Sequence, residues 1–255
     1  MGPTITKFLI TLVIAALWEA LPRLGLVPRL ILSPLSDSLA VAFTSYGMYV
    51  TNLRVTLIEI GCALLIACGG GVMVGSALGT LPRLRRLILP LASSAYAVPF
   101  VLLYPLITLW FGLGWGSKIA FAAGYGFFPV LFTTVAGMES LDRHLITVAR
   151  SMGAKGTALV FKVLVPMAIP LVLGAIKIGA AVVVSGVVAA EMLLSSEGIG
   201  YIIMQNRTSF NTPEIYLAIL VTIGIAWALE RLIYLLEMLV AGWSQHISTE
   251  STSGH

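Results

Sequence analysis

The amino-acid sequence predicts an all-α fold, a polytopic membrane bundle of about six transmembrane helices. Of the 255 residues, 58% are hydrophobic and only 10% are charged, and the mean hydropathy is +1.00. A soluble domain carries about a quarter charged residues, so an apolar solvent must cover much of this surface. The apolar residues form six segments, and the basic residues gather mainly on one side of them.

The six apolar segments run over residues 5–21, 55–78, 87–111, 119–138, 165–194 and 215–232. Most have the roughly 17–25 residues that are needed to cross the hydrocarbon core. The fifth is longer, so it projects beyond the membrane or tilts within it. A signal peptide is the alternative for the first segment. Glu19, Pro22 and the lack of a small-x-small cleavage site favour a retained helix.

The basic residues predict an orientation with a cytoplasmic N terminus in the cytoplasmic (inner) membrane. The cytoplasmic side then holds nine of them: Lys7, Arg83, Arg85, Arg86, Arg143, Arg150, Lys155, Lys162 and Arg231. The opposite side holds five: Arg23, Arg29, Arg54, Lys118 and Arg207. Lys177 lies within the fifth segment. Because cytoplasmic loops carry the excess of Lys and Arg, this distribution favours that orientation.

We predict one transmembrane domain over residues 1–247 and a polar, disordered tail over 248–255. Between the first two segments, Pro22, Pro28 and Pro34 indicate an extended stretch that leads into a short helix. The net charge of +4 comes from scattered residues without a recognition module, so nucleic acid is not an expected partner.

The loop over residues 139–166 is too polar to span the membrane. Leu141, Leu145, Val148 and Ala149 recur at helical spacing, which predicts a short amphipathic helix. Gly153 then permits a sharp turn or the close approach of another backbone. A second short helix is expected over 157–165, before Pro166. This arrangement favours a docking element for a partner, and a loop lying on the lipid surface is the alternative.

The residues of this loop resemble the EAA loop of bacterial ABC importer permeases. The similar stretch is Thr147-Val-Ala-Arg-Ser-Met-Gly153-Ala154, followed by Val163-Leu-Val-Pro166. Thr147 and Val148 stand where that family has Glu and Ala, while the spacing from Gly153 to Pro166 matches. The resemblance implies contact with an ATPase subunit through Thr147, Ala149, Arg150, Gly153, Ala154, Val163 and Pro166.

The resemblance extends to the nitrate, sulfonate and taurine branch of that family. It rests on Pro99, Pro105, Leu109-Trp-Phe-Gly-Leu-Gly114, Val188-Ala-Ala-Glu-Met-Leu193 and Gly198-Ile-Gly-Tyr201. It implies a type I ABC importer permease that forms a homodimer and binds two cytoplasmic ATPase subunits. ATP and Mg²⁺ would act on those subunits. A periplasmic or lipid-anchored binding protein would deliver a small anion (a sulfonate, taurine or nitrate) or a thiamine-precursor pyrimidine.

Two charged residues inside the fifth segment are pathway candidates. Lys177 and Glu191 are 14 residues apart, about 21 Å along a helix, so they cannot pair on one straight helix. Lys177 either contacts an anionic substrate or pairs with Glu59 or backbone carbonyls to fix helix packing. Glu191 either faces the pathway or reaches the outer interface. An intramembrane charge is costly, which is why each is a candidate.

The third and second segments carry further candidates. Pro99 and Pro105 break backbone hydrogen bonding in the third segment, and Tyr96, Phe100 and Tyr104 lie nearby. We predict that these residues line a gate, and a packing kink is the alternative. In the second segment Gly71, Gly75 and Gly79 repeat every four positions, which predicts the close approach of another helix.

The sequence holds no motif for energy-yielding chemistry. No Gly-Lys dipeptide is present, so a Walker A loop is excluded, and the three histidines lack metal-ligand spacing. We therefore predict no catalytic residue, no metal and no cofactor on this chain. An ion-coupled secondary transporter is the alternative function, but no inverted repeat around coupling carboxylates is evident. A membrane-bound enzyme is the other rival, weakened by the missing catalytic cluster.

Overall fold

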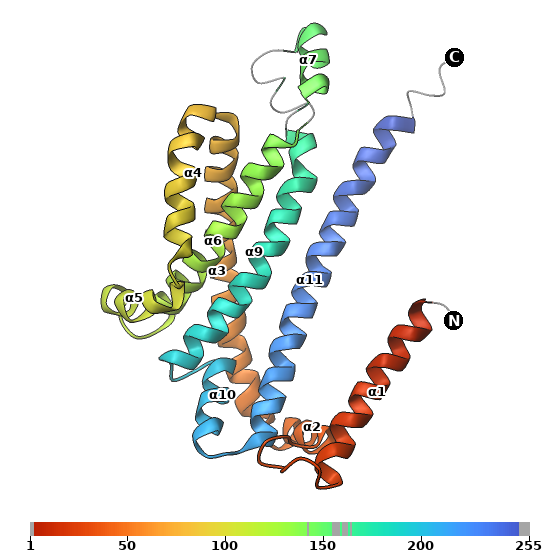
Figure 1. Ribbon diagram of the computed structural model, residues 1–255, viewed down its shortest axis with the longest axis vertical. Coiled ribbons are helices and arrows are strands. Elements are labelled where there is room, and N and C mark those ends of the chain that lie inside the picture. The colour runs from red at the N-terminus through yellow and green to blue at the C-terminus, as the bar shows by residue number, and fades with distance from the viewer. Residues whose placement is uncertain (1–2, 142, 155–158, 160–162, 164, 250–255) are drawn as a thin grey trace. The chain divides into compact units, whose positions relative to one another are not determined.

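The computed structural model describes residues 3–141, 143–154, 159, 163 and 165–249 (Figure 1). The described residues form helices and no strand, which confirms the all-α prediction. Five helices are long and apolar enough to cross a membrane, or six if one bent pair counts as a single span. The chain divides into two compact units, residues 1–58 with 187–225 and residues 59–186 with 226–255, described in turn below.

The first unit contains α1 (Pro3–Arg23), α2 (Leu35–Thr44), α10 (Ile199–Thr208) and the adjoining ends of α3 (Tyr46–Thr80), α9 (Val165–Leu193) and α11 (Thr212–Thr249). Its core consists of Tyr49, Val188, Ile199, Ile202, Ile203, Leu217 and Ala218. The short helix expected after the prolines is α2. The separate helix α10 was not expected from the sequence.

Polar contacts attach the N-terminal part of this unit to the start of α11. The indole of Trp18 donates a 2.9 Å hydrogen bond to the carbonyl of Ser33, and its ring meets Tyr216 edge-on at 5.4 Å. The hydroxyl of Tyr216 in turn donates to the carbonyl of Ile31 at 2.9 Å. These contacts tie α1 and the loop before α2 to one helix end.

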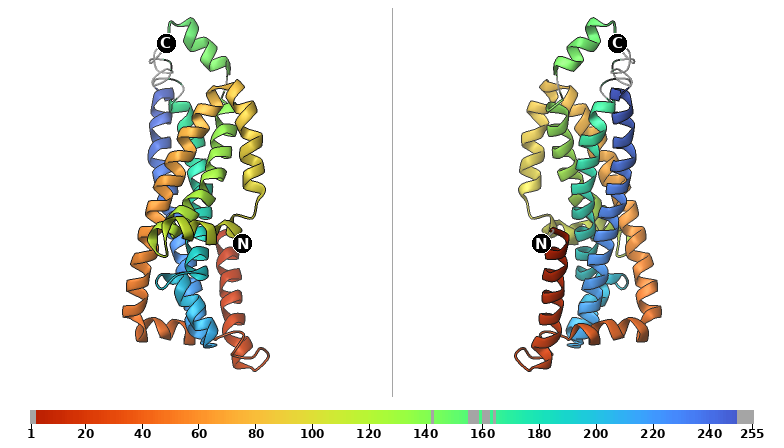
Figure 2. Two further views of the ribbon diagram at one scale, coloured as in Figure 1. Left: turned by 90° about the vertical axis from the view of Figure 1, so that its left-hand side faces the viewer. Right: turned by 90° about the vertical axis from the view of Figure 1, so that its right-hand side faces the viewer.

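The second unit contains the remainder of α3, α9 and α11, together with α4 (Pro82–Ala97), η1 (Phe100–Leu103), α5 (Tyr104–Phe111), α6 (Trp115–Glu139) and α7 (Arg143–Ser151). Within it α3, α4, α6 and α9 run side by side (Figures 1 and 2). Glycines of α3 lie against α6. A β-carbon on Gly71, Gly75 or Gly79 would lie 2.7, 2.7 or 2.5 Å from Val130, Thr134 or Met138. The predicted close approach is confirmed.

The limits of the third apolar segment, 87–111, implied one straight span. The structure shows a bent segment instead. Helix α4 ends at Ala97, and the pair α4 and η1–α5 is bent by 81°. Pro99 lacks an N–H donor and restricts the preceding residue, so Val98 adopts an extended conformation (φ −69°, ψ 129°) and the helix stops. The kink therefore lies where the prolines indicated, but it divides the segment.

The described bounds correct the ends of other segments. Helix α3 begins at Tyr46, nine residues before the predicted start at Val55, and α11 runs to Thr249 rather than ending near Leu232. The first two turns of α3 contain polar residues such as Thr51 and Asn52, whose side chains donate hydrogen bonds to backbone carbonyls one turn back. A hydropathy boundary therefore falls inside the helix. Of the tail predicted over 248–255, residues 250–255 lie outside the described residues.

Candidate functional site

The predicted docking helix is present as α7, which ends in a glycine cap. The amide of Gly153 donates to the carbonyl of Arg150, and the amide of Ala154 donates to that of Ala149, each at 3.0 Å. Gly153 has φ +88°. These bonds form a Schellman motif with Gly153 at the C′ position, which favours glycine because its φ is positive. No atom lies within 4 Å of where its β-carbon would be, so the turn requires the φ rather than close packing within the chain.

Helix α7 exposes apolar side chains. Leu145, Val148 and Met152 are 50%, 41% and 84% exposed and follow one another at helical spacing. Ile146 and Arg150 lie on another face, which lines a cavity against the ends of α3, α4 and α6. Thr147 is exposed and Ala149 is half-buried. An exposed apolar stripe on a short polar loop helix is the surface expected of a docking element.

The other predicted coupling residues follow the Gly153 turn. Ala154 closes the cap, Val163 is described as an isolated position, and Pro166 lies in the first turn of α9. The second short helix expected over 157–165 falls mainly on residues outside those described.

The gate candidates on α4 and η1 come together against α6. Tyr96 lies 5.6 Å from Phe128, Phe100 lies 5.6 Å from Phe121, and Tyr104 meets Phe121 at 5.0 Å between ring centroids. Tyr104 is fully buried, whereas Phe100 is half-buried. Pro99 separates α4 from η1, and Pro105 lies in the first turn of α5. Face and edge contacts between rings therefore hold the bent segment on α6.

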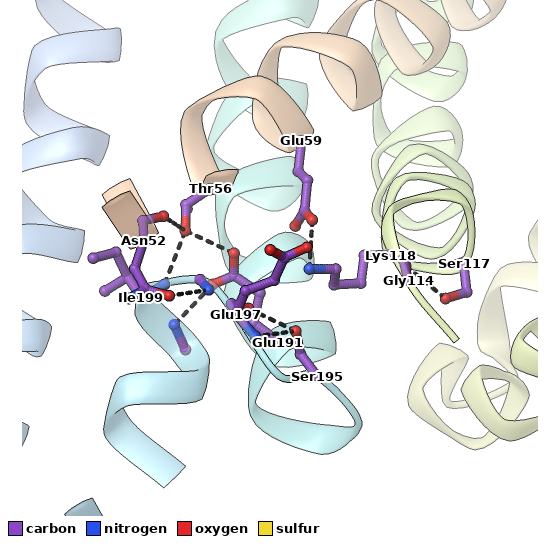
Figure 3. Close-up of polar contacts among 12 residues, drawn as sticks. Asn52, Thr56, Glu59, Gly114, Ser117, Lys118, Glu191, Ser195, Glu197 and Ile199 are labelled. Atoms are coloured by element: carbon purple, nitrogen blue, oxygen red, sulfur yellow. Dashed lines mark hydrogen bonds and ion pairs between the residues drawn. The ribbon is translucent and has the colours of Figure 1, made fainter. Parts of the chain in front are cut away.

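A buried ion pair, which the sequence did not predict, joins α3 to α6. The ammonium of Lys118 lies 2.5 Å from Oε1 of Glu59, and the two side chains are 1% and 0% exposed (Figure 3). Lys118 was assigned to the outer loop because the predicted fourth segment began after it. Helix α6 begins at Trp115, which places Lys118 in its first turn. The turn at Gly112 and Gly114, both with positive φ, marks that earlier start.

Lys177 pairs with Glu230 rather than with Glu59, so that part of the packing alternative is wrong. The Lys177 ammonium lies 3.5 Å from Oε1 of Glu230, and the side chains are 42% and 58% exposed. The pair joins α9 to α11 at an open surface of the chain. Glu59 pairs instead with Lys118.

Glu191 is 1% exposed and holds the N terminus of α10 (Figure 3). Its Oε1 accepts a 2.6 Å hydrogen bond from the hydroxyl of Thr56, and its Oε2 accepts a 2.7 Å bond from the amide of Gly200. The Thr56 oxygen accepts from the amide of Ile199 at 2.9 Å, and Asn52 Oδ1 accepts from that of Gly198 at 2.6 Å. Three side chains thus satisfy amides that the first turn of a helix leaves without intrahelical partners.

Glycine is required beside this carboxylate. A β-carbon on Gly198 or Gly200 would overlap atoms of Glu191, and Gly198 has φ +105°. The motifs around Glu191 and Gly198, which the sequence singled out separately, therefore form one structure with α3. Glu191 and Lys177, although both on α9, have entirely different partners.

Known transport proteins are similar to this chain over most of its length. Residues 69–247 match the family described as binding-protein-dependent transport system inner membrane component. The chain is 31% identical over 239 residues to the taurine transport system permease protein TauC of Escherichia coli (strain K12), covering 91% of this chain and 86% of that one.

Two further relatives carry other cargo in their names. The formylaminopyrimidine transport permease protein ThiX of Halalkalibacterium halodurans is 28% identical over 210 residues, which cover 82% of this chain and 84% of that one. The riboflavin transport system permease protein RibX of Chloroflexus aurantiacus is 36% identical over 160 residues, 63% of this chain and 60% of that one. The chain therefore belongs to the family of binding-protein-dependent transport system inner membrane components, and it is a multi-pass ABC permease subunit of a small-solute importer.

Proposed function

We propose that two copies of this chain form the translocation pathway of an ATP-driven importer and that α7 of each copy docks on a cytoplasmic ATPase subunit. ATP and Mg²⁺ bind to those two subunits, and this chain supplies no catalytic group. The observation that carries the proposal is α7 itself, with its exposed Leu145, Val148 and Met152 and its glycine-capped end. These residues give a partner an exposed apolar surface that ends at a defined turn.

In the proposed mechanism the ATPase subunits move the docked α7 helices. When ATP closes the two ATPase subunits, the docked α7 helices move together, and the paired bundles change from inward-facing to outward-facing. A periplasmic or lipid-anchored binding protein then releases its cargo into the pathway. This is alternating access between two states whose populations the bound nucleotide shifts.

We propose a small anion as the cargo, a sulfonate such as taurine or an inorganic anion such as nitrate, with a thiamine-precursor pyrimidine as the other class. The similarity to TauC and ThiX supports these two classes. Lys177 is the proposed cargo contact in the pathway, because it is a partly exposed cation within a membrane-spanning helix. Tyr96, Pro99, Phe100 and Tyr104 form the proposed gate. Glu191 acts on the pathway indirectly in this proposal, by positioning α10.

The experiment that tests docking substitutes Gly153 and measures co-purification of the ATPase subunit at equal membrane abundance of the permease. Gly153→Val and Gly153→Trp oppose the positive φ, so we expect both to lose the ATPase subunit and transport. Gly153→Asn is the matched control, since Asn tolerates left-handed backbone, and it should retain most docking. Undiminished co-purification and uptake with Val and Trp would refute the assignment of α7.

The proposed orientation places the N terminus and α7 in the cytoplasm. A cysteine at Ser151, on α7, should react with a membrane-impermeant thiol reagent only from the cytoplasmic side. A cysteine at Ser209, which follows α10, should react only from the outside. Labelling of both positions from one side would remove the docking proposal, because α7 would then be out of reach of a cytoplasmic ATPase.

A further inference from the structure

A cavity of about 440 Å³ lies between α7 and the ends of three helices of the second unit. Its polar lining comes from Thr80 at the end of α3, Arg85 on α4, Glu139 at the end of α6 and Arg150 on α7. Met138, Leu141 and Ile146 supply apolar lining. The exposed apolar stripe of α7, on which the docking proposal rests, lies on another face of that helix than this cavity.

The charges around the cavity favour an anion. Among the residues that the structure describes, two guanidinium groups and one carboxylate line it, so cationic groups outnumber the anionic one there. Glu139 pairs with Arg85 at 2.7 Å, while no carboxylate of the described residues pairs with Arg150. Arg83 and Arg86 lie near Arg85 in the first two turns of α4, and the first turn of that helix has no acidic residue. Cations at a helix N terminus oppose the helix dipole, so a bound anion would relieve this arrangement.

We propose that this cavity binds one phosphate-class oxyanion between Arg85 and Arg150, and that its source is the headgroup phosphodiester of an anionic phospholipid. Guanidinium groups match phosphate oxygens in bidentate geometry, and Arg85 has enough N–H donors to hold both Glu139 and a phosphate. The volume is that of a small-molecule site, which leaves room for the glycerol beside the phosphate. The apolar side chains of the lining suit the acylated glycerol of a phospholipid.

An anion bound in this cavity would link α7 to the transmembrane helices, because Arg150 belongs to α7 and Arg85 belongs to α4. Basic pockets between transmembrane helices on the cytoplasmic side are suited to anionic headgroups. The effect on ATPase coupling rests on the proposed function, whereas binding of the anion does not. Binding is therefore measured on the purified full-length chain, without the ATPase subunit and without transport.

The test titrates the chain in a neutral detergent with dioctanoyl phosphatidylglycerol, dioctanoyl phosphatidylcholine or inorganic phosphate, using isothermal titration calorimetry. We expect phosphatidylglycerol to bind at least about tenfold more tightly than phosphatidylcholine, since the phosphatidylcholine headgroup carries no net negative charge. Arg85→Gln and Arg150→Gln should each weaken phosphatidylglycerol binding by about tenfold. Arg83→Gln, on the same helix turn but outside the lining, is the matched control and should have little effect.

A gain-of-binding variant guards against misfolding as the cause of any loss. Glu139→Gln removes the carboxylate that competes for Arg85, so it should tighten phosphatidylglycerol binding. The alternative result is that inorganic phosphate binds in a manner that depends on Arg85 and Arg150, while phosphatidylglycerol does not bind. That result would keep the oxyanion site and identify its ligand as a free anion. Equal losses with Arg83→Gln and Arg150→Gln, or no preference among the three ligands, would overturn the site.

Discussion

Two ion pairs of the second unit join helices inside apolar segments, yet their surroundings differ completely. Glu59 and Lys118 lie 2.5 Å apart, and neither side chain is more than 1% exposed. Lys177 and Glu230 lie 3.5 Å apart and are 42% and 58% exposed. Both charges of the first pair are buried within the chain. The second presents both charges at an open surface of the chain.

The difference in burial gives the two pairs different expected roles. A buried pair costs desolvation on both partners, and removing one partner leaves an uncompensated charge. An exposed pair in a membrane-spanning helix needs water, cargo or another chain beside it. In our proposal the surface at Lys177 therefore faces the pathway, while Glu59 and Lys118 fix α3 on α6.

The largest expected effect is on the buried pair. Glu59→Gln removes the buried carboxylate that pairs with the Lys118 ammonium and should lower the stability of the chain by about 3–5 kcal/mol. The double variant Glu59→Met with Lys118→Met removes both charges and should recover most of that loss. The measurement is thermal unfolding of the purified chain in detergent. If Glu59→Gln is as stable as the wild type, the pair contributes little to stability and the prediction is wrong.

An intermediate effect is expected at Glu191, which is buried and accepts hydrogen bonds from the Thr56 hydroxyl and the Gly200 amide. Glu191→Leu removes the acceptor for the Thr56 hydroxyl and the Gly200 amide and should cost about 1–3 kcal/mol. Glu191→Gln keeps one acceptor oxygen and should lose less. Hydrogen exchange at the first amides of α10 provides the second measurement, and unchanged protection there would contradict the role of Glu191 as an anchor.

The smallest effect on stability is expected at the exposed pair. Lys177→Glu should change the unfolding free energy by no more than about 1 kcal/mol, yet it should lower uptake if Lys177 contacts an anionic cargo. The exchange variant Lys177→Glu with Glu230→Lys restores a pair of opposite charges. Uptake that stays low in the exchange variant supports cargo contact. Full recovery of uptake would show that only the pairing matters.

Local features of this molecule were predictable because local physics decides them. The stripe of Gly71, Gly75 and Gly79 predicted a helix contact, and α6 makes it. Pro99 marked the break of the third segment, because a missing N–H acts on its own helix. The helix before Gly153 and the turn after it follow from apolar spacing and from glycine's access to positive φ.

Long-range partners were not predictable in the same way. Lys118 was counted as an outer charge because a hydropathy boundary placed it just before its segment. Its partner Glu59 is distant in the chain, and no periodic pattern connects the two. The same holds for Glu191 and Thr56, which are 135 residues apart. Packing of separate helices selects such pairs, so the sequence indicated candidate charges without their partners.

By itself the sequence determined that the chain is a helical membrane protein, that prolines interrupt the third apolar segment, and which loop carries an amphipathic helix that ends at a glycine. Each of these depends on the length of an apolar run, the geometry of proline or the conformational freedom of glycine. Only the tertiary structure decided that Lys118 is buried against Glu59, that Lys177 remains exposed beside Glu230, and that Arg85 and Arg150 line one cavity. The physical reason is that burial and charge pairing depend on which helices lie against each other, and that is a property of the packed bundle.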